Sequence, residues 1–356
     1  MKIGIVTITL GQNYGNRLQN YAVQQVLKKR NYKVRTFREK EWNNTFSYRV
    51  KARIRKKTGY HWNKKSERIE KFEKFNKRYI KFDKHFLKRN GKNMKFEKKY
   101  DKFVVGSDQV WNTKFDIIGK EYFLSFVKNK PKISLAASVG LDVIDEKIYS
   151  YKKFLEQFKG ISVREEKGKE ILGQVIDKDI KVILDPTLML DVEEWIQIEE
   201  KVPNIADDYI FCYLLGNYSI GYTNKIREYA KERNMNVYFA CADQEIDAIN
   251  VNNTEFAFSP GEFVYLIHNA EKVITDSYHA VILSLLFKRN YIVIDRKDFN
   301  SRMKSRFETL AETFKIKSMF CENDDFSQNA QVDQENFKSE LKMKRNEFNE
   351  FVDKYI

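Results

Sequence analysis

The chain has 356 residues, of which 42% are hydrophobic and 14% aromatic, and this composition excludes a wholly disordered or fibrous protein. Three scattered cysteines without a CxxC pair (Cys212, Cys241 and Cys321) predict a reduced protein and argue against a zinc site. The apolar start has no cleavage-site pattern, and no run reaches the roughly 20 apolar residues of a membrane span, so we expect a cytoplasmic protein.

The length favours two domains, and residues 1–195 predict the first of them. Short apolar runs alternate there with helical segments, which is the pattern of β–α–β units in a parallel sheet. The expected strands cover residues 2–10, 33–37, 101–106, 132–138, 161–163 and 180–184, and a helix is expected over 18–30. An insertion rich in basic and aromatic residues interrupts this series at about 40–99.

A second series of strands and helices begins after a boundary near residues 192–208 and forms a domain over about 205–325. Its expected strands cover 209–215, 236–240, 272–275 and 291–295, and helices are expected at 223–233, after Ser259-Pro260, from His279 onward and at 300–314. A polar tail over 326–356 follows, with a helix at 333–355. This order predicts an α/β fold with two Rossmann-like domains that face each other across a cleft.

All of the excess positive charge lies in one segment. Residues 49–102 contain 22 lysines and arginines against 6 acidic residues, and the rest of the chain has a net charge of −1. Helical spacing of six apolar residues predicts an amphipathic helix over about 64–89: Ile69, Phe72, Phe75, Tyr79, Phe82 and Phe86. Two interpretations of the charge stay open: a solvated helix face, or peripheral contact with the anionic inner face of a membrane. No nucleic-acid motif accompanies it, so we expect no nucleic-acid partner.

The ends of several expected strands carry polar residues, which is where α/β proteins build their sites. The first such loop, at 11–19, is not a GxGxxG fingerprint. Its amides Asn13, Asn16 and Gln19 suit a neutral polyhydroxylated ligand, unless they only satisfy the backbone of the loop.

Three further strand ends carry charged or aromatic residues. Asp108 could accept a proton or a hydroxyl, and Trp111 could stack on a sugar face; the alternative is a helix cap and a core residue. Arg164 offers a planar fork for a carboxylate or phosphate, with a surface charge cluster as the alternative. The Asp185-Pro-Thr segment is expected to end a strand and turn the chain, without binding a ligand.

The most informative strand end is Thr275-Asp-Ser-Tyr-His279, which precedes the apolar run 280–287. The pattern places His279 in the first turn of a buried helix, where backbone N–H groups and the helix dipole favour anions. Asp276, three residues earlier, is expected to orient the imidazole ring and stabilise its charged form. The alternative is a capped helix with a buried neutral histidine.

Six motifs together resemble the polysaccharide pyruvyl transferase family over roughly residues 1–315. They are Asn13-Tyr-Gly-Asn-Arg-Leu-Gln19, Val105-Gly-Ser-Asp-Gln-Val-Trp-Asn112, Ala136-Ala-Ser-Val-Gly140, Ser162-Val-Arg-Glu-Glu166, Leu184-Asp-Pro-Thr187 and Thr275-Asp-Ser-Tyr-His279. The resemblance implies a fold like that of B-type glycosyltransferases, with the acceptor on the first domain and the donor on the second. It implies phosphoenolpyruvate as donor, and as acceptor a sugar of a cell-surface polysaccharide or of its lipid-linked precursor. The product would be a cyclic pyruvate ketal.

In this resemblance His279 matches the family's histidine and Arg164 its anion-binding arginine. Many relatives carry an arginine two residues before the histidine, and a glycine after it, where this chain has Ser277 and Ala280. The phosphate is therefore expected to need another cation, such as Arg296, Arg302 or the basic insertion.

The predicted site thus has three parts, with no metal and no cofactor beyond phosphoenolpyruvate as co-substrate. Its members are His279 and Asp108 for catalysis; Arg164, Asp276, Ser277 and Arg296 for the donor; and Asn13, Asn16, Gln19 and Trp111 for the acceptor. Two alternatives are a nucleotide-sugar-dependent glycosyltransferase of the same fold and a non-catalytic glycan- or membrane-binding protein.

Overall fold

A computed structural model describes residues 1–39, 64–89, 96–216, 218–241, 257–296 and 304–356. The cluster of basic residues at 51–57 and Arg302 lie outside the described residues. Within the described part, no helix is long and apolar enough to cross a bilayer.

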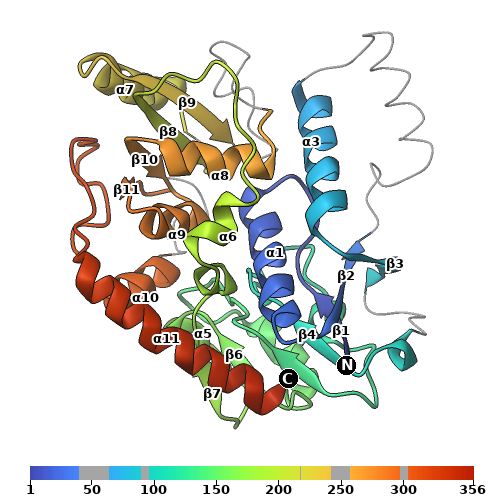
Figure 1. Ribbon diagram of the computed structural model, residues 1–356. Helices are drawn as coiled ribbons and strands as arrows, with labels where there is room; N and C mark the ends of the chain where they lie inside the picture. Colours follow the sequence, from blue (N-terminus) through green and yellow to red (C-terminus); the bar gives the residue numbers. More distant parts are fainter. Residues whose placement is uncertain (40–63, 90–95, 217, 242–256, 297–303) are drawn as a thin grey trace.

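The first domain contains a parallel sheet of five strands in the order β3-β2-β1-β4-β5, extended by the parallel pair β6-β7 through two isolated bridges (Figure 1). Its strands are β1 (Lys2–Val6), β2 (Lys33–Glu39), β3 (Phe82–Leu87), β4 (Lys102–Val105), β5 (Lys132–Ser134), β6 (Ile161–Val163) and β7 (Ile180–Val182). Its helices are α1 (Tyr14–Lys28), α3 (Lys64–Tyr79), α4 (Lys152–Leu155) and α5 (Glu166–Gly173), with a 3-10 turn η6 (Pro186–Met189). The central strands are apolar and buried on both faces, as parallel sheets require.

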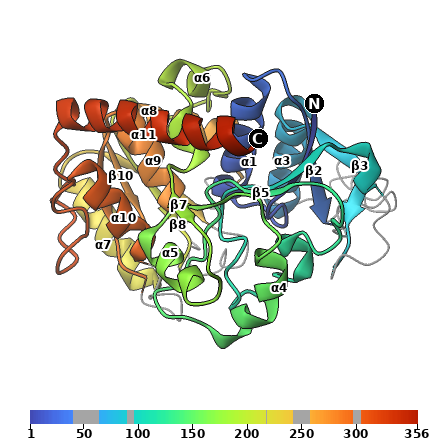
Figure 2. The same ribbon diagram turned by 90° about the horizontal axis from the view of Figure 1, so that it is seen from below.

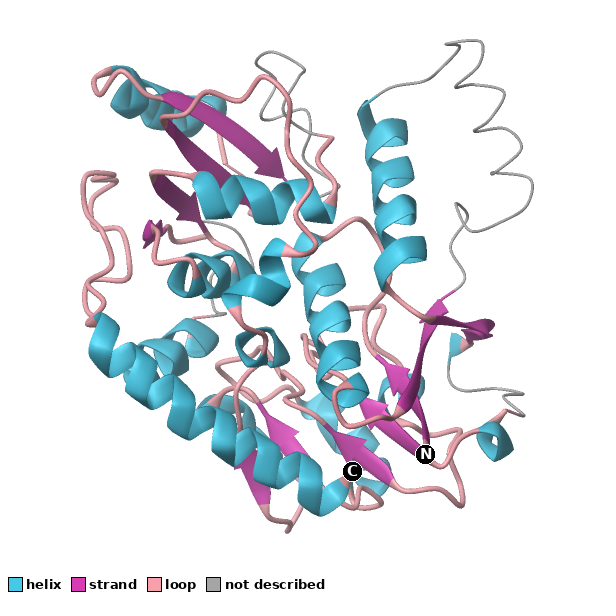
Figure 3. Ribbon diagram, viewed as in Figure 1, coloured by secondary structure: helices cyan, strands magenta, loops and turns pink. Residues whose placement is uncertain are grey.

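The second domain contains a parallel sheet of four strands in the order β11-β10-β8-β9 (Figure 3). Its strands are β8 (Tyr209–Leu214), β9 (Asn236–Cys241), β10 (Lys272–Thr275) and β11 (Asn290–Val293), and its helices are α7 (Ile220–Lys231), α8 (Pro260–Asn269), α9 (Tyr278–Leu286) and α10 (Ser305–Phe314). α6 (Val192–Ile196) lies in the segment that joins the domains. The described residues therefore confirm the predicted architecture of two parallel α/β domains.

The prediction of a single helix over 64–89 is wrong in its second half. The helix α3 ends at Tyr79, and Phe82–Leu87 forms the strand β3 at the edge of the first sheet, parallel to β2. Phe82 and Phe86 are four residues apart, and this spacing fits one face of a strand as well as one face of a helix. The end of the basic insertion is therefore part of the sheet.

Tyr14, at the start of α1, connects the two domains through packing and a hydrogen bond. Its ring stacks on Phe263 of α8 with ring centres 4.4 Å apart, and its hydroxyl donates to the backbone oxygen of Phe258 at 3.1 Å. Arg68 of α3 donates to the backbone oxygen of Gln12 at 2.5 Å, beside the same ring. One hydrophobic cluster consequently extends through α1, α8 and α9 from both domains.

The final helix α11 (Gln334–Tyr355) returns from the second domain to the first and ends close to the N-terminus (Figures 1 and 2). Arg345 donates to the backbone oxygens of Leu188 and Leu190, at 2.8 and 2.9 Å. Lys102, on β4, donates to the backbone oxygen of Ile356 at 2.6 Å. α11 therefore ties both domains into one unit.

Candidate functional site

The carboxyl ends of the two sheets face each other, and five polar side chains meet between them. Ser107 and Asp108 follow β4, Arg164 follows β6, Asp185 follows β7, and His279 lies in the first turn of α9 after β10. All five are at least nine-tenths buried. Each strand ends at the sheet edge that faces the other domain, so the parallel topology brings these distant residues together.

Arg164 is at the centre of this group. Its Nη1 lies 2.7 Å from Asp185 Oδ2 and 3.4 Å from His279 Nε2, and Ser107 Oγ donates to the same Asp185 oxygen at 2.5 Å. His279 Nε2 is also 3.6 Å from Asp185 Oδ2. A neutral ring can accept a hydrogen bond from Arg164, whereas a protonated ring can direct its Nε2–H toward Asp185. The geometry therefore serves both protonation states of the histidine.

Part of the Arg164 guanidinium makes no hydrogen bond to the described residues. Its Nε and Nη2 have no hydrogen-bond partner among the described residues, and the nearest acidic oxygens are those of Glu165 at 3.9 Å and Asp108 at 3.8 Å. Burial opposes the charge, but Asp185 and Asp108 outweigh it and raise the pKa of Arg164 above its ordinary value. A permanently charged, buried guanidinium group with N–H groups that lack hydrogen-bond acceptors can bind an anion.

Asp185 is held in its ionised form. Burial alone would raise the pKa of its carboxyl, but contact with His279, the charge of Arg164 and the Ser107 hydroxyl outweigh burial and keep that pKa well below its usual range. Its other oxygen, Oδ1, accepts hydrogen bonds from the backbone N–H and hydroxyl of Thr187. Asp185 therefore turns the chain, as expected, but it also contacts both Arg164 and His279, which the sequence prediction missed.

The structure corrects the predicted partner of His279. Asp276 accepts hydrogen bonds from the backbone N–H groups of Leu215 and Gly216 and from Arg296 Nε, at 2.7, 2.8 and 2.9 Å. Its carboxylate is thus committed within the second domain, and Asp185 of the first domain is the carboxylate beside the imidazole. Ser277 is the N-cap residue of α9, but its side chain makes no capping hydrogen bond.

Two of the four predicted acceptor contacts do not fit the structure. Trp111 is fully buried, stacks on Phe123 and donates its indole N–H to the backbone oxygen of Tyr122. Gln19 is fully buried and donates to Thr7 Oγ1 at 2.8 Å. Both side chains are therefore interior residues, and an acceptor sugar could not reach them.

The other two predicted acceptor residues, Asn13 and Asn16, are half-buried at the start of α1. Asn13 is the N-cap residue of this helix, and its side chain accepts a hydrogen bond from the backbone N–H of Asn16 at 3.2 Å. Helix α1 starts at Tyr14, four residues earlier than predicted. The first turn of α1 contacts the first turn of α9, because Gly15 lies directly against the His279 ring.

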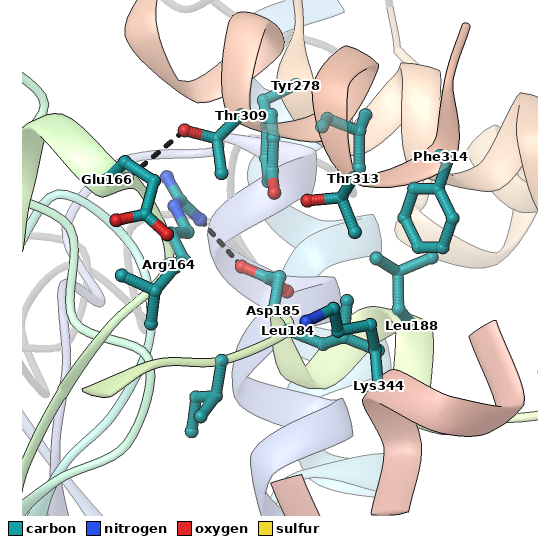
Figure 4. A pocket seen from close by; sticks show the side chains of 13 residues that line it. Arg164, Glu166, Leu184, Asp185, Leu188, Tyr278, Thr309, Thr313, Phe314 and Lys344 are labelled. Carbon is teal, nitrogen blue, oxygen red and sulfur yellow. Dashed lines mark hydrogen bonds and ion pairs between the residues drawn. The ribbon is translucent and has the colours of Figure 1, made fainter. Parts of the chain in front are cut away.

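A small pocket of about 60 Å³ borders the Arg164–Asp185 pair (Figure 4). Tyr278 lines it from α9, Thr309 and Thr313 line it from α10, and Lys344 lines it from α11. This volume is enough for several water molecules or one small polar group. The ion pair therefore has open space beside it that both domains and the final helix enclose.

Two further residues lie beside this group and were not predicted as site residues: an aromatic residue, Tyr278, and a basic residue, Arg306. Tyr278, next to His279, has its ring 4.6 Å from the Arg164 guanidinium carbon, and burial followed by the Asp185 charge raises the pKa of its hydroxyl above the ordinary value. Arg306, in the first turn of α10, is 6% exposed and also lies near the Tyr278 ring. Tyr278 was quoted within a motif without a role, and no local pattern marks Arg306.

The fold and the site define a protein of the B-type glycosyltransferase architecture, in which two Rossmann-like domains place a site between them. Its fold matches that of a putative UDP-N-acetylglucosamine 2-epimerase from Listeria monocytogenes, with a TM-score of 0.56 and 13% identity over 98% of this chain and 90% of that chain. The UDP-GlcNAc 2-epimerase of Methanocaldococcus jannaschii, in complex with UDP-GlcNAc and UDP, gives a TM-score of 0.52 and 17% identity over 97% and 93% of the two chains. At these identities the likeness concerns the fold alone.

The family model of polysaccharide pyruvyl transferases matches residues 13–298. The chain belongs to the polysaccharide pyruvyl transferase family, as its motifs indicate. No curated protein matches it.

Proposed function

We propose that the protein transfers pyruvate from phosphoenolpyruvate to a sugar of a cell-surface polysaccharide, or of its lipid-linked precursor, and forms a cyclic ketal. The observation that carries this proposal is the buried guanidinium of Arg164. Its Nε and Nη2 make no hydrogen bond to any described residue, and its Nη1 lies 3.4 Å from His279 Nε2. A cation beside a titratable imidazole suits a donor that is an anion and must accept a proton. Family membership favours the same reaction.

The chemistry assigns one role to each group. His279, as imidazolium, gives a proton to the methylene carbon of phosphoenolpyruvate, which makes the neighbouring carbon electrophilic. One sugar hydroxyl attacks that carbon and gives its proton to a carboxylate, for which Asp108 is our choice. Phosphate leaves, and a second hydroxyl closes the ketal. Of the two hydroxyl protons, one replaces the proton now in the methyl group and the other leaves with the phosphate, so the reaction balances.

Arg164 and the residues around Asp276 would hold the donor in different ways. Arg164 would bind the donor directly through its Nε and Nη2 groups. The N-terminal ends of α1, α5 and α9 would add backbone N–H groups, which attract anions. Asp276, Ser277 and Arg296 would shape the wall of the second domain, with Arg296 already bonded to Asp276. Asn13 and Asn16, at the start of α1, remain our choices for contacts with the acceptor.

Isothermal titration with phosphoenolpyruvate and with UDP-GlcNAc tests the donor. We expect binding of phosphoenolpyruvate, no binding of UDP-GlcNAc, and release of inorganic phosphate when a cell-envelope glycan is added. Binding of UDP-GlcNAc alone would favour a nucleotide-sugar-dependent glycosyltransferase. Binding of a glycan with neither donor would favour a non-catalytic protein.

We further propose that the outer side of α3 and the edge strand β3 contact an anionic membrane surface, where a lipid-linked acceptor would lie. Five basic side chains are exposed on this part of the chain: Lys74, Lys77, Arg78, Lys81 and Lys84. Each basic residue near such a surface contributes about 1 kcal/mol. Flotation with phosphatidylserine vesicles should recover the protein at low salt, and replacing the five residues by Gln should abolish that recovery.

A further inference from the structure

The guanidinium group of Arg345, on the final helix α11, binds one short segment of the first domain. Its Nε donates to the backbone oxygen of Leu188 at 2.8 Å, and its Nη2 donates to that of Leu190 at 2.9 Å. Its Nη1 lies 2.5 Å from Asp191 Oδ1. All three nitrogens of this side chain therefore bind the segment 188–191.

This segment belongs to the end of the 3-10 turn η6, which needs donors from outside. A helical turn leaves its last carbonyl groups without a partner inside the turn, and η6 has only four residues. The indole N–H of Trp195, on α6, donates to the backbone oxygen of Thr187 at 3.3 Å. Arg345 supplies the donors for the carbonyl groups of Leu188 and Leu190. Side chains of two other helices thus complete the hydrogen bonds of this turn.

The same turn carries the central carboxylate of the site, because Asp185 is its N-cap residue. Asp185 Oδ1 accepts hydrogen bonds from the backbone N–H and the hydroxyl of Thr187, at 2.9 and 2.6 Å. Its other oxygen, Oδ2, lies 2.7 Å from Arg164 Nη1 and 3.6 Å from His279 Nε2. The carboxylate that contacts both site residues is therefore fixed to the turn that Arg345 binds.

One side of this turn borders open space. The pocket of about 60 Å³ is lined by three residues of the turn and its approach, and by side chains of α10 and α11 (Figure 4): Leu184, Asp185, Leu188, Thr313 and Lys344. A segment that borders a cavity has fewer packing contacts on that side. Its hydrogen bonds to α11 therefore contribute more to its position than they would in a filled core.

We propose that Arg345 is a positioning residue for the reaction: it holds η6, and through η6 the Asp185 carboxylate, in place beside His279. Arg345 acts through Asp185 and is not assigned a contact with the substrate. This inference rests on the proposed function and deepens it. It gives the final helix a role in the site, although that helix lies beyond residues 13–298, which the family model matches.

Arg345→Met and Arg30→Met form a matched pair of variants. Both arginines join α11 to the first domain, and their side chains are 23% and 21% exposed. Arg30 follows α1 and bonds instead to Asn349 and Asp353 of α11. Both substitutions should lower the urea midpoint of unfolding by similar amounts, so the state of the turn distinguishes them. If Arg345→Met does not fold, Arg345→Lys serves in its place, because one ammonium group cannot bond both carbonyl oxygens and Asp191.

Hydrogen–deuterium exchange of the full chain, followed by mass spectrometry of the peptide that covers 184–191, reports on the turn directly. Two backbone N–H groups of this peptide donate to oxygens of Asp185, both at 2.9 Å. Arg345→Met should accelerate exchange there at least about fivefold, the effect of losing one hydrogen bond, whereas Arg30→Met should not. Unchanged exchange in Arg345→Met would overturn the inference and leave the proposed function standing.

Phosphate release from phosphoenolpyruvate, with a cell-envelope glycan as acceptor, connects the turn to the reaction. In Arg345→Met, kcat should fall about tenfold while the KM for phosphoenolpyruvate changes less than about threefold, because the imidazole loses its carboxylate partner whereas Arg164 stays at the end of β6. Arg30→Met should keep both values, and equal kcat values in the two variants would overturn the inference. Wild-type protein that releases no phosphate would overturn the proposed function, and faster exchange confined to Arg345→Met would still support the hold on the turn.

Discussion

His279 of the second domain packs directly against Gly15 of the first. A Cβ atom at Gly15 would lie 2.3 Å from His279 Nδ1 and 3.0 Å from its Cγ, distances at which one of the groups must shift. Gly15 belongs to the first turn of α1, so the absence of a side chain there allows the two helix starts to approach. The position of the imidazole is thus set by residues of both domains.

Gly15→Ala should therefore displace the imidazole from Arg164 and Asp185. We expect turnover to fall at least about tenfold, because misplacement of a reacting group by about 1 Å costs up to about 100-fold. Phosphate release from phosphoenolpyruvate in the presence of acceptor measures the effect. Gly173→Ala is the control, since its added Cβ would meet no described atom within 4 Å beyond its chain neighbours and the backbone of its own helix, and it should keep wild-type turnover. Unchanged turnover in Gly15→Ala would contradict the close fit.

A second prediction concerns the imidazole itself. His279→Gln should lower turnover by about 100-fold or more, because a general acid contributes about 10²–10⁴-fold, while the fold stays intact by circular dichroism. His268, on α8, provides a matched control: its Nδ1 is 2.6 Å from Glu199 and it lies outside the group of strand-end residues. His268→Gln should keep turnover near the wild-type value. Retained turnover in His279→Gln would refute its role as acid.

The ionised state of Asp185 predicts a dependence of stability on pH. Its pKa is lower in the folded protein than in the unfolded chain, so its contribution is complete above the unfolded value of about 4 and is lost as the pH falls below it. Asp185→Asn should lower the free energy of unfolding at pH 7 by about 3–5 kcal/mol, because Arg164 loses its buried counter-charge.

Urea denaturation of wild type and Asp185→Asn between pH 7 and pH 3 checks this prediction. The difference in free energy of unfolding between the two proteins should be constant from pH 7 to about 5. It should narrow at lower pH, because the Asp185 carboxyl takes up a proton in the unfolded wild-type chain while it stays ionised in the folded protein. The groups that face this carboxyl are Arg164, His279, Ser107 and Thr187. A difference that stays constant down to pH 3 would contradict the assignment.

The sequence predicted the strands and helices better than the contacts between domains. The strand 272–275 and the helix opened by Ser259 were confirmed, because buried apolar runs and a capping box are local signals. The contact between Arg164 and His279 joins residues 115 apart, and it depends on how the two domains pack. Nearness in the chain suggested Asp276 as the partner of His279, but its oxygens are used by the loop at Leu215 and Gly216.

The last prediction tests the stacked contact between Tyr14 and Phe263, which joins the two domains that form the site. Tyr14→Ala should lower the free energy of unfolding by about 3–5 kcal/mol, because it removes a fully buried ring that stacks on Phe263. Tyr14→Phe keeps the ring and loses one hydrogen bond to Phe258, so it should cost about 1 kcal/mol. Because Arg164 and His279 belong to different domains, Tyr14→Ala should also lower turnover, whereas Tyr14→Phe should not. Urea denaturation and phosphate release measure both effects, and equal stability of the two variants would show that the stacked ring does not hold the domains together.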